Sequence, residues 1–222
     1  MRKSTILTIV LIVVITGTLF GVWFWTNQPS SQTNYPGEIR VYDGQKLDSI
    51  NDFQTEAING NQNINITTYT LSITGMVPEE QILNYTQIVN NVNNYPHYKE
   101  VVTLHCVDGW QVTALWEGVL VKDLLQAANY NPNAPILIIN CADGYNTSLT
   151  IPYIVNNNVT LAFKVNNVTL PKSEGYPFQL VCPGKLGYKW AKWVTSLTVS
   201  NDTSFRGYWE SRGYSNDANW TP

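Results

Sequence analysis

The segment VVTLHCVDGWQVTALWEG, residues 101–118, is the stretch from which the fold and chemistry of this chain are best interpreted. Its β-branched beginning predicts a strand that ends at Cys106, and Asp108-Gly109 then turns the chain. A thiol that a turn presents at the end of a strand can face a pocket instead of the core. The alternative, which residue type alone favours, is a buried cysteine that packs as a small hydrophobic side chain.

Further β-rich runs lie on both sides of this segment. The predicted strands are residues 68–74, 100–105, 135–140, 147–151, 159–165, 178–182 and 193–199. Apolar residues at helical spacing predict two helices, residues 79–92 and 119–128. Because strands predominate and the helices do not alternate regularly with them, we expect a single mixed, β-dominated α+β domain.

A second informative segment is LPKSEGYPFQLVCPGKLGYKWAKW, residues 170–193. Its glycines and prolines predict a loop, and this loop carries Lys185, Lys189 and Lys192. A cofactor with a terminal phosphate needs backbone amides and cations, which such a loop supplies. The alternative for a lysine cluster taken by itself is a solvated face.

Both segments resemble the signature of the sulfite-oxidase-type molybdopterin oxidoreductases. The first reads Cys-Val-Asp-Gly-Trp from Cys106 and continues as LWEGVLVKDLL, and the second follows the family's spacing of leucine, proline, glycine and lysine. CADGYNTSLT, residues 141–150, and Gly-Tyr-Trp-Glu, residues 207–210, also resemble family segments. The resemblance covers roughly residues 51–219 and implies that family's domain type, with Mo-molybdopterin as the cofactor.

The resemblance implies a set of site residues. In this family the cysteine of the first segment binds the metal, so Cys106 is implied as the molybdenum ligand and as a catalytic residue. A metal deprotonates a coordinating thiol, so no neighbouring base is needed. Asp143 and Tyr145 are implied as catalytic residues at the substrate pocket, with a plain turn as the alternative. The implied cofactor contacts are Asn51, Gln54, Thr55, Cys106, Cys141, Glu174, Gln179, Lys185, Lys189, Trp190, Ala191 and Lys192.

Two positions depart from the family pattern. Glu174 stands where His or Asn is usual, and Gln179 stands where Arg is usual. Arg grips a phosphate with a permanent charge, whereas Gln offers only a neutral donor. We therefore expect a pterin clamp that is weaker or that relies on the lysines. These departures favour an alternative function, a cofactor-free extracellular binding module that retains the fold.

Two further features are assigned no chemistry. The aromatic segment FRGYWESRGYSNDANW, residues 205–220, could stack on a sugar or close a pocket, but such a segment more often packs aromatic area onto the domain, which is what we expect. His105 precedes Cys106 in the predicted strand, where neighbouring side chains point to opposite faces, so we expect a packed histidine and not a second metal ligand.

The beginning of the chain predicts a membrane anchor. Residues 5–25 are apolar and uncharged, and about 20 such residues cross a bilayer core. We predict an anchor at residues 1–25, a linker at 26–38 and the oxidoreductase domain at 39–222. Arg2 and Lys3 should stay cytoplasmic, which places the domain on the extracytoplasmic side. A cleaved signal peptide is the alternative, although the apolar run is long and lacks an Ala-x-Ala end.

Composition limits the partners. The chain has a formal net charge of −3 with only 13% charged residues, a balance that gives no electrostatic reason to expect a nucleic-acid partner. It has three cysteines, of which Cys141 and Cys182 could form a disulfide, and no haem-attachment motif. Electrons therefore have to come from or go to a separate partner, a membrane cytochrome or a soluble carrier.

The arginines limit the substrate. There are only four, Arg2, Arg40, Arg206 and Arg212, and none is beside Cys106 in the sequence. Sulfite oxidases hold their dianionic substrate with arginines around the metal. For this chain the resemblance instead implies a small neutral oxo-compound such as a sulfoxide, as in the related bacterial methionine-sulfoxide reductases. We predict oxygen-atom or two-electron transfer at a Cys106-ligated molybdenum centre.

Overall fold

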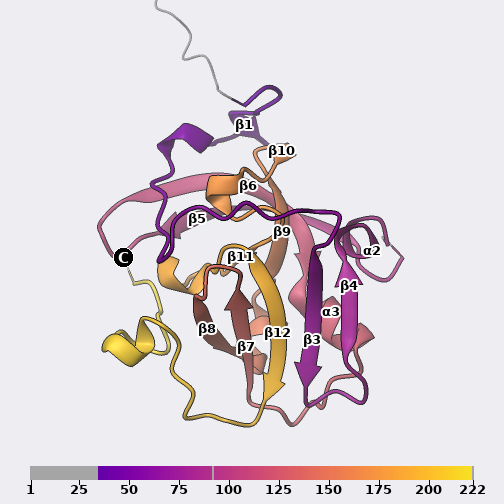
Figure 1. Cartoon of the computed structure of the whole chain (residues 1–222). Helices are drawn as coiled ribbons and strands as arrows, with labels where there is room; N and C mark the ends of the chain where they lie inside the picture. The colour runs from indigo at the N-terminus through magenta and orange to yellow at the C-terminus, as the bar shows by residue number, and fades with distance from the viewer. Residues whose placement is uncertain (1–34, 92, 222) are drawn as a thin grey trace, which may run out of the picture. The chain divides into compact units, whose positions relative to one another are not determined.

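Two five-stranded β-sheets form the framework of the protein (Figure 1). The computed structural model describes residues 35–91 and 93–221. The first sheet has the order β10-β9-β6-β5, with β11 also paired to β9, and all of its pairs are antiparallel. Its strands are β5 (His97–His105), β6 (Gln111–Leu120), β9 (Thr160–Val165), β10 (Val168–Thr169) and β11 (Gln179–Val181).

The second sheet has the order β4-β3-β12-β7-β8. Its strands are β3 (Thr70–Gly75), β4 (Gln81–Asn84), β7 (Ile136–Cys141), β8 (Asn146–Thr150) and β12 (Val194–Ser200). The β3–β12 pair is parallel and the other pairs are antiparallel, so β12 at the centre brings the two ends of the domain together. The short antiparallel pair β1 (Val41–Tyr42) and β2 (Gln45–Lys46) stands outside both sheets.

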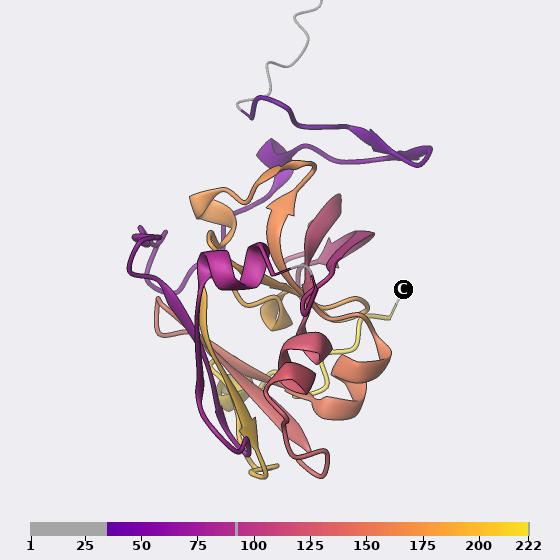
Figure 2. The ribbon, with the colours of Figure 1, turned by 90° about the vertical axis from the view of Figure 1, so that its right-hand side faces the viewer.

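Three short helices and four 3-10 turns complete the fold of the described residues. The helices are α2 (Tyr85–Val89), α3 (Val121–Ala127) and α4 (Ile151–Asn156), and the turns are η1 (Ile50–Asp52), η2 (Lys172–Glu174), η3 (Gly187–Lys189) and η4 (Glu210–Arg212). Figure 2 shows α3 and α4 next to each other. α3 follows β6 directly and α4 follows β8 directly, so each helix begins where a strand leaves its sheet.

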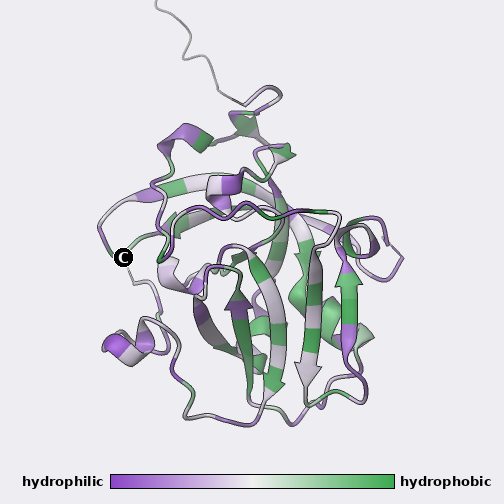
Figure 3. Ribbon diagram, in the orientation of Figure 1, coloured by the Kyte–Doolittle hydropathy of each residue, from purple (hydrophilic) through white to green (hydrophobic). Residues whose placement is uncertain are grey.

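Alternating side chains place the core between these elements. Leu71 and Ile73 of β3 are completely buried, and Leu197 and Val199 of β12 are at most 1% exposed. Figure 3 shows the corresponding alternation of hydrophobic and polar bands along β3 and β12. This period of two is what a strand with one buried face requires.

One buried carboxylate connects three strands of the first sheet. Glu117 of β6 has a side chain that is 6% exposed, and its oxygens lie 3.1 Å from Lys99 Nζ of β5 and 3.2 Å from Lys164 Nζ of β9. The next residue, Gly118, has no room for a side chain, because a Cβ there would lie 2.3 Å from the Leu161 carbonyl oxygen. The β6–β9 register shifts at this point.

The β-dominated α+β fold predicted from the sequence is confirmed. Each of the seven predicted strands coincides with an observed strand to within a few residues, although β5 begins earlier, at His97. The long strand β6 and the helix α4 were not predicted. The predicted helix 119–128 is observed as α3, and its Val121, Leu124 and Leu125 are buried. Val119 and Leu120 instead belong to β6.

The predicted helix 79–92 was wrong in its first half. Gln81–Asn84 form β4, which pairs with β3, and only α2 is helical. Asn84 explains the boundary, because its side chain accepts a hydrogen bond from the Gln87 N–H and so begins the helix there. A short run such as Gln-Ile-Leu-Asn fits both the helical period of 3.6 residues and the strand period of two. Its pairing with the edge of β3 makes it a strand. Residue 92 lies outside the described residues.

The predicted anchor, residues 1–25, and most of the predicted linker lie outside the described residues. Residues 35–38, the end of that linker, are bound to the domain. The Glu38 carboxylate accepts hydrogen bonds from the Ile50 N–H at 2.7 Å and from the Asn166 amide at 3.2 Å. Glu38 of the predicted linker therefore makes side-chain contacts with the domain. In the part of the chain that the structure describes, no helix has the length and apolar character needed to span a bilayer.

Candidate functional site

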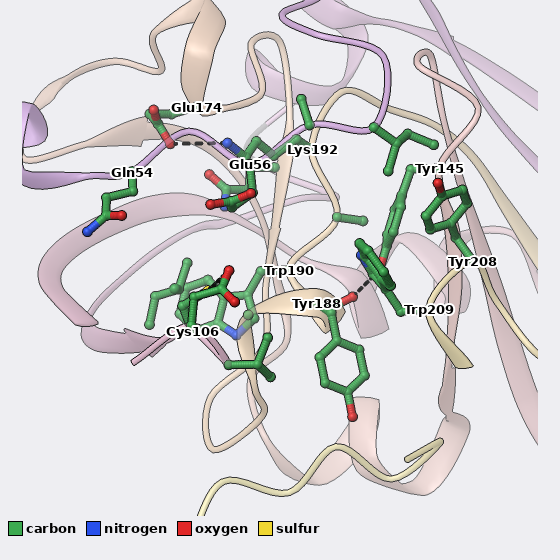
Figure 4. Close-up of a pocket in the computed structure, with 18 of the residues that line it drawn as sticks. Gln54, Glu56, Cys106, Tyr145, Glu174, Tyr188, Trp190, Lys192, Tyr208 and Trp209 are labelled. Carbon is green, nitrogen blue, oxygen red and sulfur yellow. Dashed lines mark hydrogen bonds and ion pairs between the residues drawn. The ribbon is translucent and has the colours of Figure 1, made fainter. Parts of the chain in front are cut away.

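A pocket of about 400 Å³ lies at the meeting point of five chain segments (Figure 4). They are the segment after η1, the β5–β6 turn, the β7–β8 turn, the region from η2 to the start of β12, and the C-terminal segment, residues 205–221. Because these segments lie far apart in the sequence, the pocket exists only in the folded domain.

The β5–β6 turn presents Cys106 to this pocket. The Cys106 N–H donates to the Trp110 carbonyl at 2.9 Å, and the Gly109 N–H donates to the Cys106 carbonyl at 3.2 Å. Gly109 has φ +89°, a left-handed conformation that glycine adopts without steric cost. The sequence Asp108-Gly109 thus ends the strand and fixes the cysteine at its tip, as predicted.

The Cys106 sulfur is partly buried and lies among negative charges. Its Sγ is 3.8 Å from an Asp108 carboxylate oxygen. Burial raises the pKa of the Cys106 thiol, and the charges of Asp108 and Glu56 raise it further. Reactive nucleophilic thiols have the opposite environment, with cations that lower the pKa. A bound metal cation would reverse the effect of these surroundings, so the site suits a metal ligand better than a free nucleophile.

Several residues predicted to contact the cofactor line the same pocket. These are Gln54, Glu174, Gln179, Trp190, Ala191 and Lys192. The Lys192 ammonium lies 3.6 Å from the Glu174 carboxylate and donates to the Ser173 carbonyl at 3.0 Å. Burial lowers the pKa of Lys192, while the charge of Glu174 acts against that effect. Glu174, the first departure from the family pattern, therefore neutralises the lysine next to it.

Two buried polar atoms of the pocket have no hydrogen-bond partner among the described residues. They are the Gln179 side-chain carbonyl oxygen and the Trp110 indole N–H. Gln179 is 1% exposed, and a buried polar atom without a partner is costly. A flat heterocycle that both donates and accepts hydrogen bonds, such as a pterin, could pair with both. These residues therefore fit the implied cofactor.

The side chains available as metal ligands also fit the implied cofactor. Among the described residues there is no group of three or more His, Cys, Asp or Glu side chains that could hold a metal ion. Cys106 would supply one ligand to a metal held here, and a cofactor would have to supply the others.

Asp143 and Tyr145, predicted at the substrate pocket, both line it. The Asp143 carboxylate accepts a hydrogen bond from the Tyr145 N–H at 3.0 Å and thereby shapes the β7–β8 turn. The Tyr145 hydroxyl donates to the Tyr188 carbonyl. The sequence offered two interpretations of Asp143 and Tyr145, a substrate pocket or a plain turn. Both features are present, because the two residues form a turn and also line the pocket.

Two of the predicted lysines point elsewhere. Lys189 is completely buried and forms an ion pair with Glu210, and it donates to the Ser148 carbonyl at 2.9 Å. Lys185 donates to the Asp217 carbonyl at 2.7 Å and to the Asn219 side chain at 2.6 Å. Neither lines the pocket. Their ammonium groups already have protein partners, so only Lys192 of the cluster is placed to meet a cofactor.

Three other predicted contacts lie outside the pocket lining. Asn51 is part of η1, where its N–H donates to the Ser49 hydroxyl. Thr55 acts indirectly, because its hydroxyl donates to the Glu174 carboxylate at 3.3 Å. Cys141 is buried at the end of β7, and burial raises the pKa of its thiol. Cys141 and Cys182 are both free thiols, so the disulfide that the sequence left open does not form.

The sequence did not identify several residues that line the pocket. Tyr208, Trp209 and Tyr214 come from the C-terminal segment, for which packing was preferred over the closing of a pocket and no residue was assigned to the site. Their aromatic density was the available signal, but the sequence could not show which face they cover. Glu56 also faces the pocket, and its charge affects both Cys106 and Lys192. His105 stacks on Trp220 with ring centroids 3.8 Å apart, which confirms the packed histidine.

Comparisons with known proteins identify the family of this chain. Residues 58–209 match the family model described as the oxidoreductase molybdopterin binding domain. A putative protein-methionine-sulfoxide reductase subunit of Azospira oryzae is 29% identical over 157 residues, which cover 71% of this chain and 56% of that protein. Sulfite oxidase of Arabidopsis thaliana is 24% identical over 182 residues, covering 66% of this chain and 45% of that protein. The chain thus spans about half the length of these two relatives.

The fold also has a counterpart among solved structures. The crystal structure of the sulfane dehydrogenase SoxCD from Paracoccus pantotrophus matches with a TM-score of 0.59 and 24% sequence identity, covering 64% of this chain and 41% of that one. The family model covers more than half of the chain and includes Cys106, Gln179 and Lys192 of the pocket. The chain therefore belongs to the family of oxidoreductase molybdopterin-binding domains.

Proposed function

We propose that this protein is a molybdenum-cofactor-dependent oxidoreductase in which the Cys106 thiolate is the protein ligand to the metal. The observation that carries the proposal is the position of the Cys106 sulfur, at the tip of β5 and in the lining of a pocket of about 400 Å³. Trp110 and Gln179, each with a buried polar atom that has no partner among the described residues, also line the pocket. A cysteine that only filled the core would have no such pocket beside it.

The residues around Cys106 would hold and orient the cofactor. Gln179 offers a carbonyl oxygen, Trp110 offers an N–H, and Trp190 and Ala191 form a buried wall that excludes water. Lys192 is the cation in the pocket lining that could bind a phosphate, although it already forms an ion pair with Glu174. When bound, the cofactor supplies two-electron redox and oxygen-atom-transfer chemistry, and the protein supplies position and surroundings.

The charge of the pocket favours a substrate that is not an anion. Its lining contains four carboxylates, Glu56, Asp108, Asp143 and Glu174, but a single cation, Lys192. The arginines in the described part of the chain, Arg40, Arg206 and Arg212, do not line it. We infer a small uncharged oxo-compound such as a sulfoxide, the class of substrate for which the Azospira oryzae relative is named. Sulfite, the substrate of the other relative, is a dianion that this lining would repel.

Electrons have to be exchanged with another molecule. Reduction of a sulfoxide to a thioether consumes two electrons and two protons and releases the oxygen as water. We propose a separate carrier, a membrane cytochrome or a soluble redox protein, as the electron donor.

We also propose that the apolar residues 5–25 anchor the protein, with the domain on the extracytoplasmic side. Protease treatment of intact cells tests this arrangement, because an exported domain is cleaved without lysis.

Bound molybdenum tests the proposed function. The full chain is produced in a host that makes molybdopterin, and metal per polypeptide is measured in wild type, Cys106→Ser and Cys182→Ser. Cys182 is the matched control, since it is completely buried and does not line the pocket. We expect about one molybdenum per chain in wild type and in the control, and less than about a tenth of that in Cys106→Ser.

A folded wild-type protein without molybdenum from this host would overturn the proposal. This result would favour the second candidate function, a cofactor-free binding module. The Glu174–Lys192 ion pair supports that candidate, because Glu174 already pairs with the cation that a phosphate needs. Metal that remains in Cys106→Ser would show that another residue is the ligand. Reductase assays with dimethyl sulfoxide and oxidase assays with sulfite then separate the substrate classes.

A further inference from the structure

The side of the pocket away from Cys106 is aromatic. Tyr208, Trp209 and Tyr214 of the C-terminal segment lie beside Tyr145 of the β7–β8 turn, and we call these four residues the aromatic wall. Ring centroids are 5.2 Å apart for Tyr208 and Trp209, 5.3 Å for Trp209 and Tyr214, and 5.9 Å for Tyr145 and Tyr208. Figure 4 shows Tyr145, Tyr208 and Trp209 on one side of the pocket, with Cys106 and Gln54 on the other.

Buried contacts hold the aromatic wall in place. Glu210 directly follows Trp209, is 5% exposed, pairs with Lys189, and accepts a hydrogen bond from the Thr147 hydroxyl at 2.5 Å. The Tyr208 N–H donates to the Asn146 carbonyl at 2.9 Å. The aromatic rings are therefore attached to β8 before any ligand arrives, which reduces the entropic cost of binding.

The charges around the wall favour a cation. The carboxylates of Glu56 and Asp143 line the pocket, and Glu174 neutralises the only lysine there. The guanidinium of Arg212, in the C-terminal segment, lies 3.6 Å from the centre of the Tyr208 ring, and Arg212 does not line the pocket. That contact shows a ring of the wall already holding a cation on one face. Aromatic faces attract cations through their quadrupole, and carboxylates nearby add to this attraction.

We propose that the aromatic wall binds the alkylammonium group of a cationic substrate. The inference deepens the proposed function, because it rests on that function for the reaction at the other end of the substrate, next to Cys106. An uncharged alkyl group of the same shape would gain only the burial of its surface. An alkylammonium group gains that burial and the attraction of the rings and carboxylates. The substrate class is then an oxo-compound whose non-reacting end is a small alkylated ammonium.

A pair of isosteric probes tests the proposal. Choline and 3,3-dimethylbutan-1-ol differ in one atom, a charged nitrogen in place of a carbon, and binding of each is measured by calorimetry on the full chain. We expect choline to bind roughly five to thirty times more tightly than the alcohol. Trp209→Leu should reduce this ratio to near one. Trp220→Leu is the matched control, because Trp220 stacks on His105 and does not line the pocket, and it should keep the ratio.

Equal binding of the two probes to wild type, or an unchanged ratio in a folded Trp209→Leu, would overturn the proposal. If Trp209→Leu does not fold, Tyr214→Leu replaces it, because Tyr214 is 40% exposed and tolerates truncation better. The measurement is made on both metal-free and molybdenum-loaded protein. If the protein prefers choline but never binds molybdenum, the proposed function is rejected and this inference stands. If the molybdenum-loaded protein shows no preference for choline, this inference is rejected and the proposed function stands.

Discussion

At the scale of single residues, the pocket depends on charges that compensate one another at close range. Glu174 is 3% exposed, and its carboxylate is held by the Lys192 ammonium and the Thr55 hydroxyl. Such a group keeps its charge at low cost only while its partner is present, because a buried charge without a counter-charge is strongly destabilising. The pair is therefore both part of the candidate cofactor site and part of the stability of the domain.

Removal of one partner of this pair should cost more than removal of both charges. We expect Lys192→Met to lower the free energy of unfolding by about 2–4 kcal/mol, because it leaves Glu174 uncompensated. The double variant Lys192→Met/Glu174→Gln should recover at least half of that loss. Urea unfolding of the metal-free protein measures both. A double variant that is no more stable than the single one would contradict this account of the pair.

At the scale of elements, the first sheet depends on a connection across β5, β6 and β9. Burial alone would raise the pKa of Glu117, but the hydrogen bonds and charges of Lys99 and Lys164 outweigh it and lower the pKa below its ordinary value. A carboxylate whose pKa is lowered in the folded state stabilises the fold above its unfolded pKa. That contribution is lost as the pH falls through the folded pKa.

Glu117→Gln should therefore have two effects. It should lower the free energy of unfolding at neutral pH by about 1–2 kcal/mol, since the two lysines are partly exposed and solvent weakens the ion pairs. It should also make the loss of stability between about pH 5 and pH 3 less steep than in wild type. Thermal unfolding followed by circular dichroism across this range measures both effects.

Glu100 on β5 provides a control of the opposite sign. Burial raises the pKa of Glu100 above its ordinary value, so its charge at neutral pH opposes folding. Glu100→Gln should leave the stability at neutral pH unchanged or slightly increased. If both variants lost stability equally, the effect of Glu117→Gln would be due to the glutamine and not to the lost charge.

At the scale of the whole molecule, the pocket joins parts of the chain that are distant in sequence. Gln54, Cys106, Gln179 and Trp209 meet in it, so a cofactor bound there contacts much of the domain and stabilises the folded state only. We expect removal of the cofactor to lower the melting temperature by roughly 5–10 °C, if the cofactor is present at about a hundred times its Kd. Calorimetry on loaded and metal-free protein measures this, and Cys106→Ser should melt like metal-free wild type.

The sequence predicted seven of the observed strands and the position of Cys106 because both follow from local patterns. Alternation identifies a strand with one buried face, and Asp108-Gly109 identifies a turn. The resemblance to the family then located Gln179 and Lys192 near Cys106. The roles of Lys189 and Trp209 could not be predicted in this way. Lys189 pairs with Glu210, and Trp209 lines the same pocket as Tyr145, and tertiary packing alone creates both arrangements. β4 was interpreted as a helix because a short apolar run fits both periods.

The ion pair between Lys189 and Glu210 has a consequence for incomplete chains. A polypeptide that stops before Glu210 would leave the ammonium of Lys189 sealed beneath β8 with no counter-charge, and it would also lack Trp209 and Tyr214. Such a product would be unstable by several kcal/mol and open to proteolysis. Residues 205–221 thus complete the binding site and the core together, so degradation removes the molecules that lack both.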